Sequence, residues 1–195
     1  MRTIGSVVAA LAYGEKIEPA AAQIIYESSD ITRGALTALG MTAERIEELL
    51  GKAKTRYLSC LSLCESPIEQ VMLAGLAFMY VQDSDSFPNA IHDIQSGDPW
   101  PDRPVVIAPQ FNIARYRLDF LVHIQTASGI RQIAVECDGR QYHSNIQDRQ
   151  NDADRDAYLA ALGIKTIRYT GSWIYKNASR VADEISCIIS EERKK

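Results

Sequence analysis

The chain has 195 residues, of which 46% are hydrophobic and 24% are charged, a composition typical of a globular protein with one well-buried domain and room for a small extension. Its net charge of -4 at pH 7 argues against broad, electrostatically driven binding to nucleic acid, so any phosphate-binding surface must be local. No stretch approaches the roughly 20 apolar residues that a membrane-spanning helix requires.

Cysteine spacing and the N-terminus both favour a cytoplasmic protein that makes no membrane contact. The four cysteines do not have the spacing of a zinc site and indicate reduced thiols. Arg2 and the apolar residues 4–12 resemble a secretion signal, but this stretch is short and acidic helix-forming sequence follows it.

Residues 1–58 are predicted to form two or three helices, which together make a helical N-terminal extension. Thr42 is a suitable cap for one of them, over residues 43–58. A basic recognition face is absent, so we expect helical packing, or a surface for a protein partner or a second copy of the chain, rather than a DNA-binding helix-turn-helix.

The next helix is predicted from its first residues and runs to about Tyr80. Ser66 is the cap, Pro67 lies in the first turn and Glu69 follows three residues after the cap, which is a capping box. Residues 83–104 are rich in Asp, Ser, Pro and Gly and have no periodicity, which predicts a long loop. This loop either borders a substrate groove or is an exposed insertion.

Three strands follow the loop, the first over residues 105–113 and the next two joined as a hairpin. Residues 126–129 suit a four-residue hairpin loop ending in glycine. The second strand, residues 116–124, alternates, with Leu118, Phe120, Val122 and Ile124 on one side and Asp119, Leu121 and His123 on the other.

The register of this hairpin decides which acidic residues meet. If Gln125 and Ile130 close the loop, Asp119 faces Glu136 and Arg117 faces Asp138. The same register places the four apolar residues of the second strand on the side of Ile133 and Val135. Hydrophobic pattern and loop length therefore agree on one pairing, which presents Asp119, Glu136 and Asp138 together.

Beyond the hairpin we predict a helix over residues 148–162, a strand over 164–170 and a closing helix from 177 to about 192. In the first helix Asp152, Arg155, Leu159 and Leu162 share one face. The leucines should hold that face against the sheet, so Asp152 and Arg155 point toward the carboxylates. Arg155 could then bind a phosphate, neutralise Glu136 or pair with Asp152.

In this order, the motifs resemble the PD-(D/E)XK nuclease superfamily, and most closely its branch similar to very-short-patch-repair endonucleases. The resemblance covers Ser66 to the C-terminus. The matching residues are Glu69, Asp119, Glu136, Asp138, Gly139, His143, Asp152, Arg155, Leu159, Gly163 and Arg168. It implies that residues 59–195 form a nuclease-like α/β domain with a restriction-endonuclease-like core: helix, three antiparallel strands, helix, strand, helix.

The resemblance also implies a metal-dependent endonuclease that acts on nucleic acid, with DNA as the expected substrate. Asp119, Glu136 and Asp138 would hold Mg²⁺ or Mn²⁺ through oxygen ligands. His143 would move a proton or bind phosphate, or act only as a hydrogen-bonded loop histidine. Glu69 would either lie near the metal or only close its helix. Asp138 replaces the superfamily's usual lysine, which leaves the general base unassigned.

A second hypothesis from another class is a catalytically silent module that keeps the core to bind DNA or a protein partner. The acidic net charge favours it. An Arg117–Asp138 salt bridge would favour it too, because it would leave fewer acids for a metal.

Overall fold

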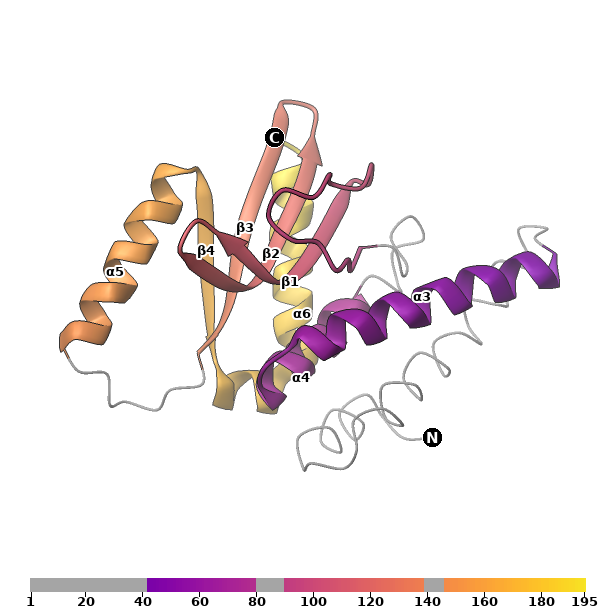
Figure 1. Cartoon of the computed structure of the whole chain (residues 1–195), viewed down its shortest axis with the longest axis horizontal. Coiled ribbons are helices and arrows are strands. Elements are labelled where there is room, and N and C mark those ends of the chain that lie inside the picture. The colour runs from indigo at the N-terminus through magenta and orange to yellow at the C-terminus, as the bar shows by residue number, and fades with distance from the viewer. Residues whose placement is uncertain (1–41, 80–89, 139–145) are drawn as a thin grey trace.

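The protein is mixed α/β, as predicted. The computed structural model describes residues 42–79, 90–138 and 146–195, and the elements below belong to those ranges (Figure 1). They are α3 (Ala43–Leu63), α4 (Pro67–Met79), β1 (Val105–Ile113), β2 (Tyr116–Thr126), β3 (Gly129–Asp138), α5 (Ile146–Ala161), β4 (Ile164–Thr170) and α6 (Gly171–Arg193).

The four strands form one sheet in the order β1-β2-β3-β4. The first three are antiparallel neighbours, and β4 joins β3 in parallel after the crossover through α5. This is the predicted order of helix, three strands, helix, strand and helix. No helix in the described ranges is long and apolar enough to cross a membrane.

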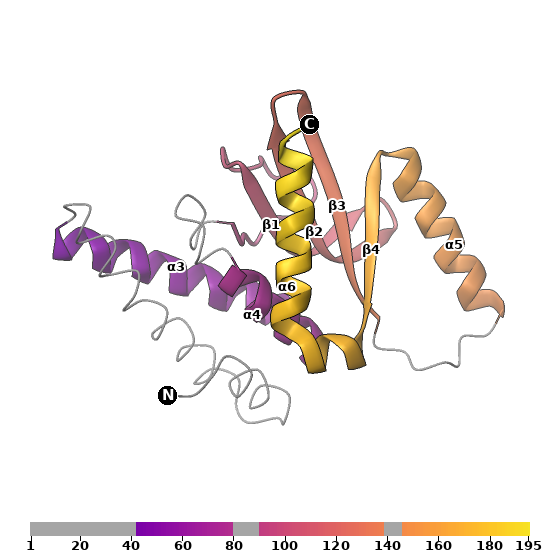
Figure 2. The ribbon, with the colours of Figure 1, turned by 180° about the vertical axis from the view of Figure 1, so that it is seen from behind.

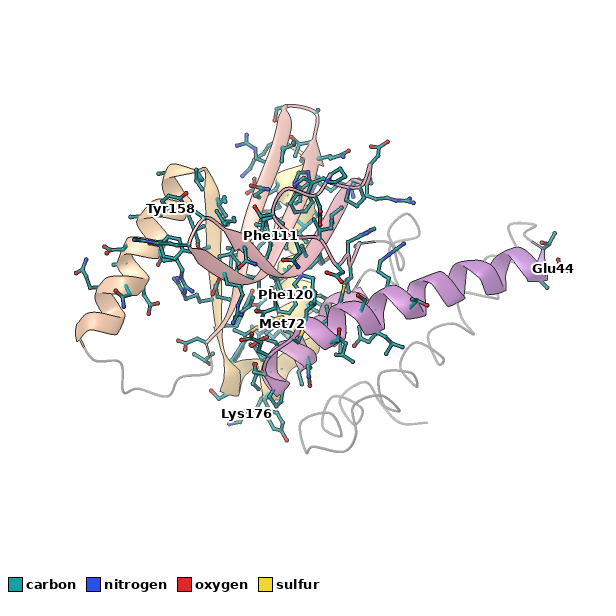
Figure 3. The ribbon with its side chains drawn as sticks, in the orientation of Figure 1. Glu44, Met72, Phe111, Phe120, Tyr158 and Lys176 are labelled. Atoms are coloured by element: carbon teal, nitrogen blue, oxygen red, sulfur yellow. The ribbon has the colours of Figure 1, made fainter. Side chains whose placement is uncertain are left out.

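Helices α4 and α6 cover one face of the sheet (Figure 2). Met72 of α4 and Phe120 of β2, both labelled in Figure 3, belong to the larger core cluster, which also contains Val122, Ile133 and Val135. The strands are rich in β-branched residues, which pack well on a pleated surface. This core fixes β2 and β3, the strands that carry the predicted acids.

The opposite face carries a smaller core, to which α5 is attached by one buried leucine. Leu121, Ala134 and Leu159 belong to this second cluster. The second half of the predicted loop also covers this face: Trp100 stacks on His123 with ring centroids 4.2 Å apart. Ile94 and Trp100 of this loop are therefore packed on the sheet, whereas residues 96–99 and 102–104 are exposed.

The predicted hairpin register is confirmed, but the loop is shorter than expected. Gln125 pairs with Ile130, and Thr126 pairs with Gly129 as well. The connection therefore contains two residues, Ala127 and Ser128, instead of four. The extra pair lengthens both strands without shifting the register. The ladder ends at Phe120 and Val135, so the predicted facing pairs Asp119–Glu136 and Arg117–Asp138 lie beyond it and are not formed as ladder pairs.

Leu118 was predicted to lie with Phe120, and this was wrong. It packs in the smaller cluster, whereas Phe120 packs in the larger one. In β1 the same shift separates Ile107, in the larger cluster, from Phe111, in the smaller one. Both shifts occur beside Gln110, whose φ of 52° lies in the left-handed region that side chains rarely adopt.

Two further expectations need correction at helix ends. Leu162 is 53% exposed because α5 ends at Ala161, so only Leu159 of the predicted pair is buried. The last helix begins at Gly171 rather than Asn177, and Asn177 is a non-helical residue within it. Thr170 caps this helix, and its hydroxyl accepts a hydrogen bond from the Trp173 N–H.

The proposed N-terminal extension lies largely outside the described residues. Its last helix, α3, is present and crosses the suggested boundary at residue 58. Tyr57, Cys60 and Leu61 in the C-terminal part of α3 belong to the larger core. This end of α3 is therefore packed with the sheet domain.

Candidate metal and phosphodiesterase site

A pocket of about 600 Å³ lies where β2 and β3 separate, between the start of α4 and the start of α5. Five acidic side chains and two arginines contribute to its wall. Its lining residues are Ser66, Glu69, Asp119, Glu136, Cys137, Asp138, Asn151, Asp152, Arg155 and Arg168. Five of the six predicted site residues are thus together; the sixth, His143, lies outside the described residues.

Asp119 occupies the point at which β2 leaves β3. The ladder between these strands runs from Thr126 and Gly129 to Phe120 and Val135. Just beyond it, the Asp119 carboxylate accepts a hydrogen bond from the Cys137 N–H, with an Oδ2–N distance of 2.6 Å. The side chain thereby takes the place of a ladder bond. Burial raises the pKa of Asp119, and this hydrogen bond partly opposes the rise.

Glu136 is the most deeply buried acid described on β3, with 6% of its surface exposed. One of its oxygens, Oε2, lies 3.2 Å from the Arg155 guanidinium. The other, Oε1, has no hydrogen-bond partner among the described residues. Burial raises the pKa of Glu136 to about 7, with Arg155 lowering it and Asp119 raising it further. Two acids close enough to repel one another thus share one partly desolvated space.

Helix α5 brings the positive charge to the pocket. Arg155 contacts both Glu136 and Asp152, the latter at 3.6 Å, so two of the partners proposed from sequence are combined in the structure. Arg168 of β4 pairs with Asp156 of α5 through both guanidinium nitrogens. Together with buried Leu159, these ion pairs fix α5 beside the carboxylates.

Glu69 both closes its helix and lines the pocket, so the two roles suggested by the sequence do not exclude one another. Its Oε1 accepts a hydrogen bond from the Ser66 hydroxyl at 2.6 Å. Its Oε2 accepts one from the Glu65 N–H at 2.7 Å. Ser66 in return accepts the Glu69 N–H at 3.3 Å, so the predicted capping box forms as a variant in which the Glu65 N–H takes the place of the Ser66 N–H.

Arg117 forms an ion pair with Glu65, not the proposed salt bridge with Asp138. Asp138 is exposed and pairs with Thr170 in the parallel β3–β4 ladder. The Arg117–Asp138 salt bridge, which would have favoured a silent module, is therefore not formed. Arg117 pairs instead with Glu65, the residue before the capping box.

Sequence reasoning missed Gln110, which connects the first strand to this site. Its amide nitrogen donates to Glu69 Oε2 at 2.7 Å, and the side chain is buried. The available signal was a polar residue directly after Pro109 in a strand whose only other polar residue is Asn112. Asn151 was also missed, because a polar residue on a polar helix face carries no distinguishing pattern.

The comparisons with known proteins agree with this geometry at a coarse level. The family model REase_MTES_1575, of restriction-endonuclease-like type, matches residues 102–189, slightly less than half of the chain. The match includes Asp119, Glu136 and Arg155 but not Glu69. It supports a restriction-endonuclease-type nuclease and does not bear on the very-short-patch-repair branch. No curated protein and no solved structure gave a significant match.

Proposed function

We propose that this protein is a divalent-metal-dependent endonuclease that hydrolyses phosphodiester bonds, with DNA as its substrate. The observation that carries the proposal is the pair of neighbouring acids, Asp119 and Glu136, in one pocket with Arg155. The helix motif around Arg155 supports the further proposal that the chain belongs to the branch similar to very-short-patch-repair endonucleases.

The acids fit a hard cation. Carboxylate oxygens are the ligands that Mg²⁺ and Mn²⁺ prefer, and Glu136 Oε1 is a buried oxygen without a partner in the described part of the chain. A positive ion would also offset the burial, and the smaller repulsion from Asp119, that raise the pKa of Glu136. The described residues contain no ready-made group of three His, Cys, Asp or Glu side chains for a metal. We therefore assign the ion to Asp119 and Glu136, with Asp138 as an outer candidate.

The chain's own residues would bind and orient the substrate. A bound divalent ion supplies acidified water and stabilises charge on a phosphate. Arg155 lies within ion-pair distance of Glu136 and faces the same pocket, so its guanidinium can hold a phosphate oxygen once a metal neutralises Glu136. Arg168 adds a second positive charge to the same wall. With aspartate at position 138, no lysine is available there as a base.

A catalytically silent nucleic-acid- or protein-binding module is the second candidate. The Arg155–Glu136 ion pair favours it, because it already compensates the charge that a metal would neutralise. The net charge of -4 favours a protein partner over DNA. The two candidates differ in one respect that can be measured, namely metal-dependent cleavage.

Cleavage assays separate the two candidates. Supercoiled circular DNA, linear DNA, single-stranded DNA and RNA are incubated with Mg²⁺, Mn²⁺ or chelator, beside Asp119→Ala and Glu136→Ala. We expect nicking of the circle, which has no ends, and its loss with chelator or with either substitution. If the wild-type protein cleaves none of these and binds no Mn²⁺ by calorimetry, the silent module is the better account.

A further inference from the structure

Gln110 lies where the side-chain alternation of two neighbouring strands shifts by one residue. On one side of it Pro109 pairs with Phe120, and on the other Phe111 pairs with Leu118. The pairing keeps its register across this point, so no residue is inserted. Gln110 and Asp119 therefore occupy opposite positions between these two pairs, at the place where β2 leaves β3.

The backbone of Gln110 is strained there, with a φ of 52°. Non-glycine residues in this region tend to occur where surrounding structure enforces them, often at functional sites. The conformation places a buried amide against the Glu69 carboxylate at 2.7 Å. Because an ionised carboxylate only accepts hydrogen bonds, the amide nitrogen must be the group that faces it.

The hydrogen bond from Gln110 is not needed to close helix α4. Ser66 and the Glu65 N–H already hold the Glu69 carboxylate in the capping box. These donors come from the chain next to Glu69 itself and fix it only relative to its own helix. Gln110 comes from β1, so it is the donor that fixes Glu69 relative to the sheet and to Asp119.

We propose that Gln110 is a positioning residue for the cleavage reaction, which holds the Glu69 carboxylate in the pocket wall beside Asp119. The inference rests on the proposed function. Glu69 and Asp119 line the same pocket, and Glu69 is near enough to act on Asp119 electrostatically. A rotated Glu69 would change the charge that surrounds the metal and its water, whereas nucleic-acid contacts elsewhere would be unaffected.

Substitution with glycine tests this role, because glycine tolerates positive φ and removes the side chain together with its amide. In Gln110→Gly we expect kcat to fall about 10- to 100-fold, the size of effect typical of residues that support a metal site without binding the ion, with KM for DNA within about twofold of wild type. Calorimetric Mn²⁺ affinity without DNA should fall as well. Ala114→Gly is the matched control: Ala114 has a φ of 51°, is exposed in the same hairpin and does not line the pocket, so its cleavage rate should stay unchanged.

A double-mutant cycle with Glu69→Gln identifies the route of the effect. If Gln110 acts through Glu69, the kcat of the double variant should be about equal to that of the single variant with the lower kcat. Multiplying effects, or an unchanged kcat and Mn²⁺ affinity in Gln110→Gly, would overturn the proposal while leaving the nuclease function intact. A wild-type protein that cleaves no substrate at all would overturn the function, and this role with it.

Discussion

Glu136 should make the metal-free protein less stable as the pH rises. Its pKa is raised from 4.5 to about 7 in the folded chain, mainly by burial. A group with a raised folded pKa gives stability that is fully present below its unfolded pKa and is lost as the pH rises through its folded pKa. The relevant window therefore runs from about pH 4.5 to about pH 7.

The size of this effect follows from the same two values. A difference of one unit between the folded and unfolded pKa corresponds to about 1.4 kcal/mol. The rise in the pKa of Glu136 from 4.5 to about 7 therefore lowers the free energy of unfolding of the wild type by about 3 kcal/mol as the pH rises through this window. Glu136→Gln removes the titrating group with little change in volume. The free energy of unfolding of Glu136→Gln minus that of wild type should therefore be about 3 kcal/mol larger at pH 8.5 than at pH 4.

Urea unfolding in chelator, followed by circular dichroism at both pH values, measures this difference. Taking the difference between variant and wild type cancels the titration of the acids that do not interact with Glu136. Glu191→Gln, an exposed glutamate in α6, controls for the loss of one surface charge. A stability difference that does not change between pH 4 and pH 8.5 would refute the idea that a buried, partly unpaired Glu136 lines the pocket.

Three other substitutions test the elements that build the site. Arg155→Met should bind Mn²⁺ about tenfold more tightly at pH 9, since a unit positive charge about 5 Å from the ion costs roughly 1–3 kcal/mol. It should cleave more slowly, because it lacks the guanidinium proposed to hold the phosphate. Weaker Mn²⁺ binding by calorimetry would argue against an ion beside Arg155. Leu159→Ala should lower unfolding free energy by about 3 kcal/mol, because Leu159 is fully buried; a loss under 1 kcal/mol in urea would mean that α5 is held otherwise. Ser66→Ala should cost about 1 kcal/mol by removing the cap, and an unchanged urea midpoint would contradict that.

Much of the fold was predictable because period and turn signals coincided. The limits of β1 and β4 were predicted to the residue, and the capping box at Ser66 marked the start of α4. The hairpin register followed from a hydrophobic pattern that tolerates no slip by one residue. The prediction that failed was local. The predicted alternation of β2 is correct from Ile124 back to Phe120 but not at Leu118, because the backbone of Gln110 in the neighbouring strand is strained.

The site was predictable to the extent that its acids lie at one end of one hairpin. Asp119, Glu136 and Asp138 line a common pocket, and Arg155 reaches Glu136 from a helix whose facing leucine is buried. The Glu69–Gln110 bond joins residues 41 positions apart, and no periodicity or spacing encodes such a contact. Leu162 was wrongly predicted to be buried because α5 ends one residue before it. The spacing of apolar residues along a helix does not by itself fix where the helix ends.

The most direct test of the account locates the metal on the chain. Fe²⁺ is substituted for Mg²⁺ and supplied with ascorbate and peroxide, so that radicals formed at the bound ion cut the backbone next to it, and the fragments are mapped by mass spectrometry. We predict cuts near residues 119 and 136, suppressed by excess Mg²⁺ and absent in Asp119→Asn. Cuts confined to other parts of the chain, or an identical pattern in Asp119→Asn, would contradict a divalent ion held between β2 and β3.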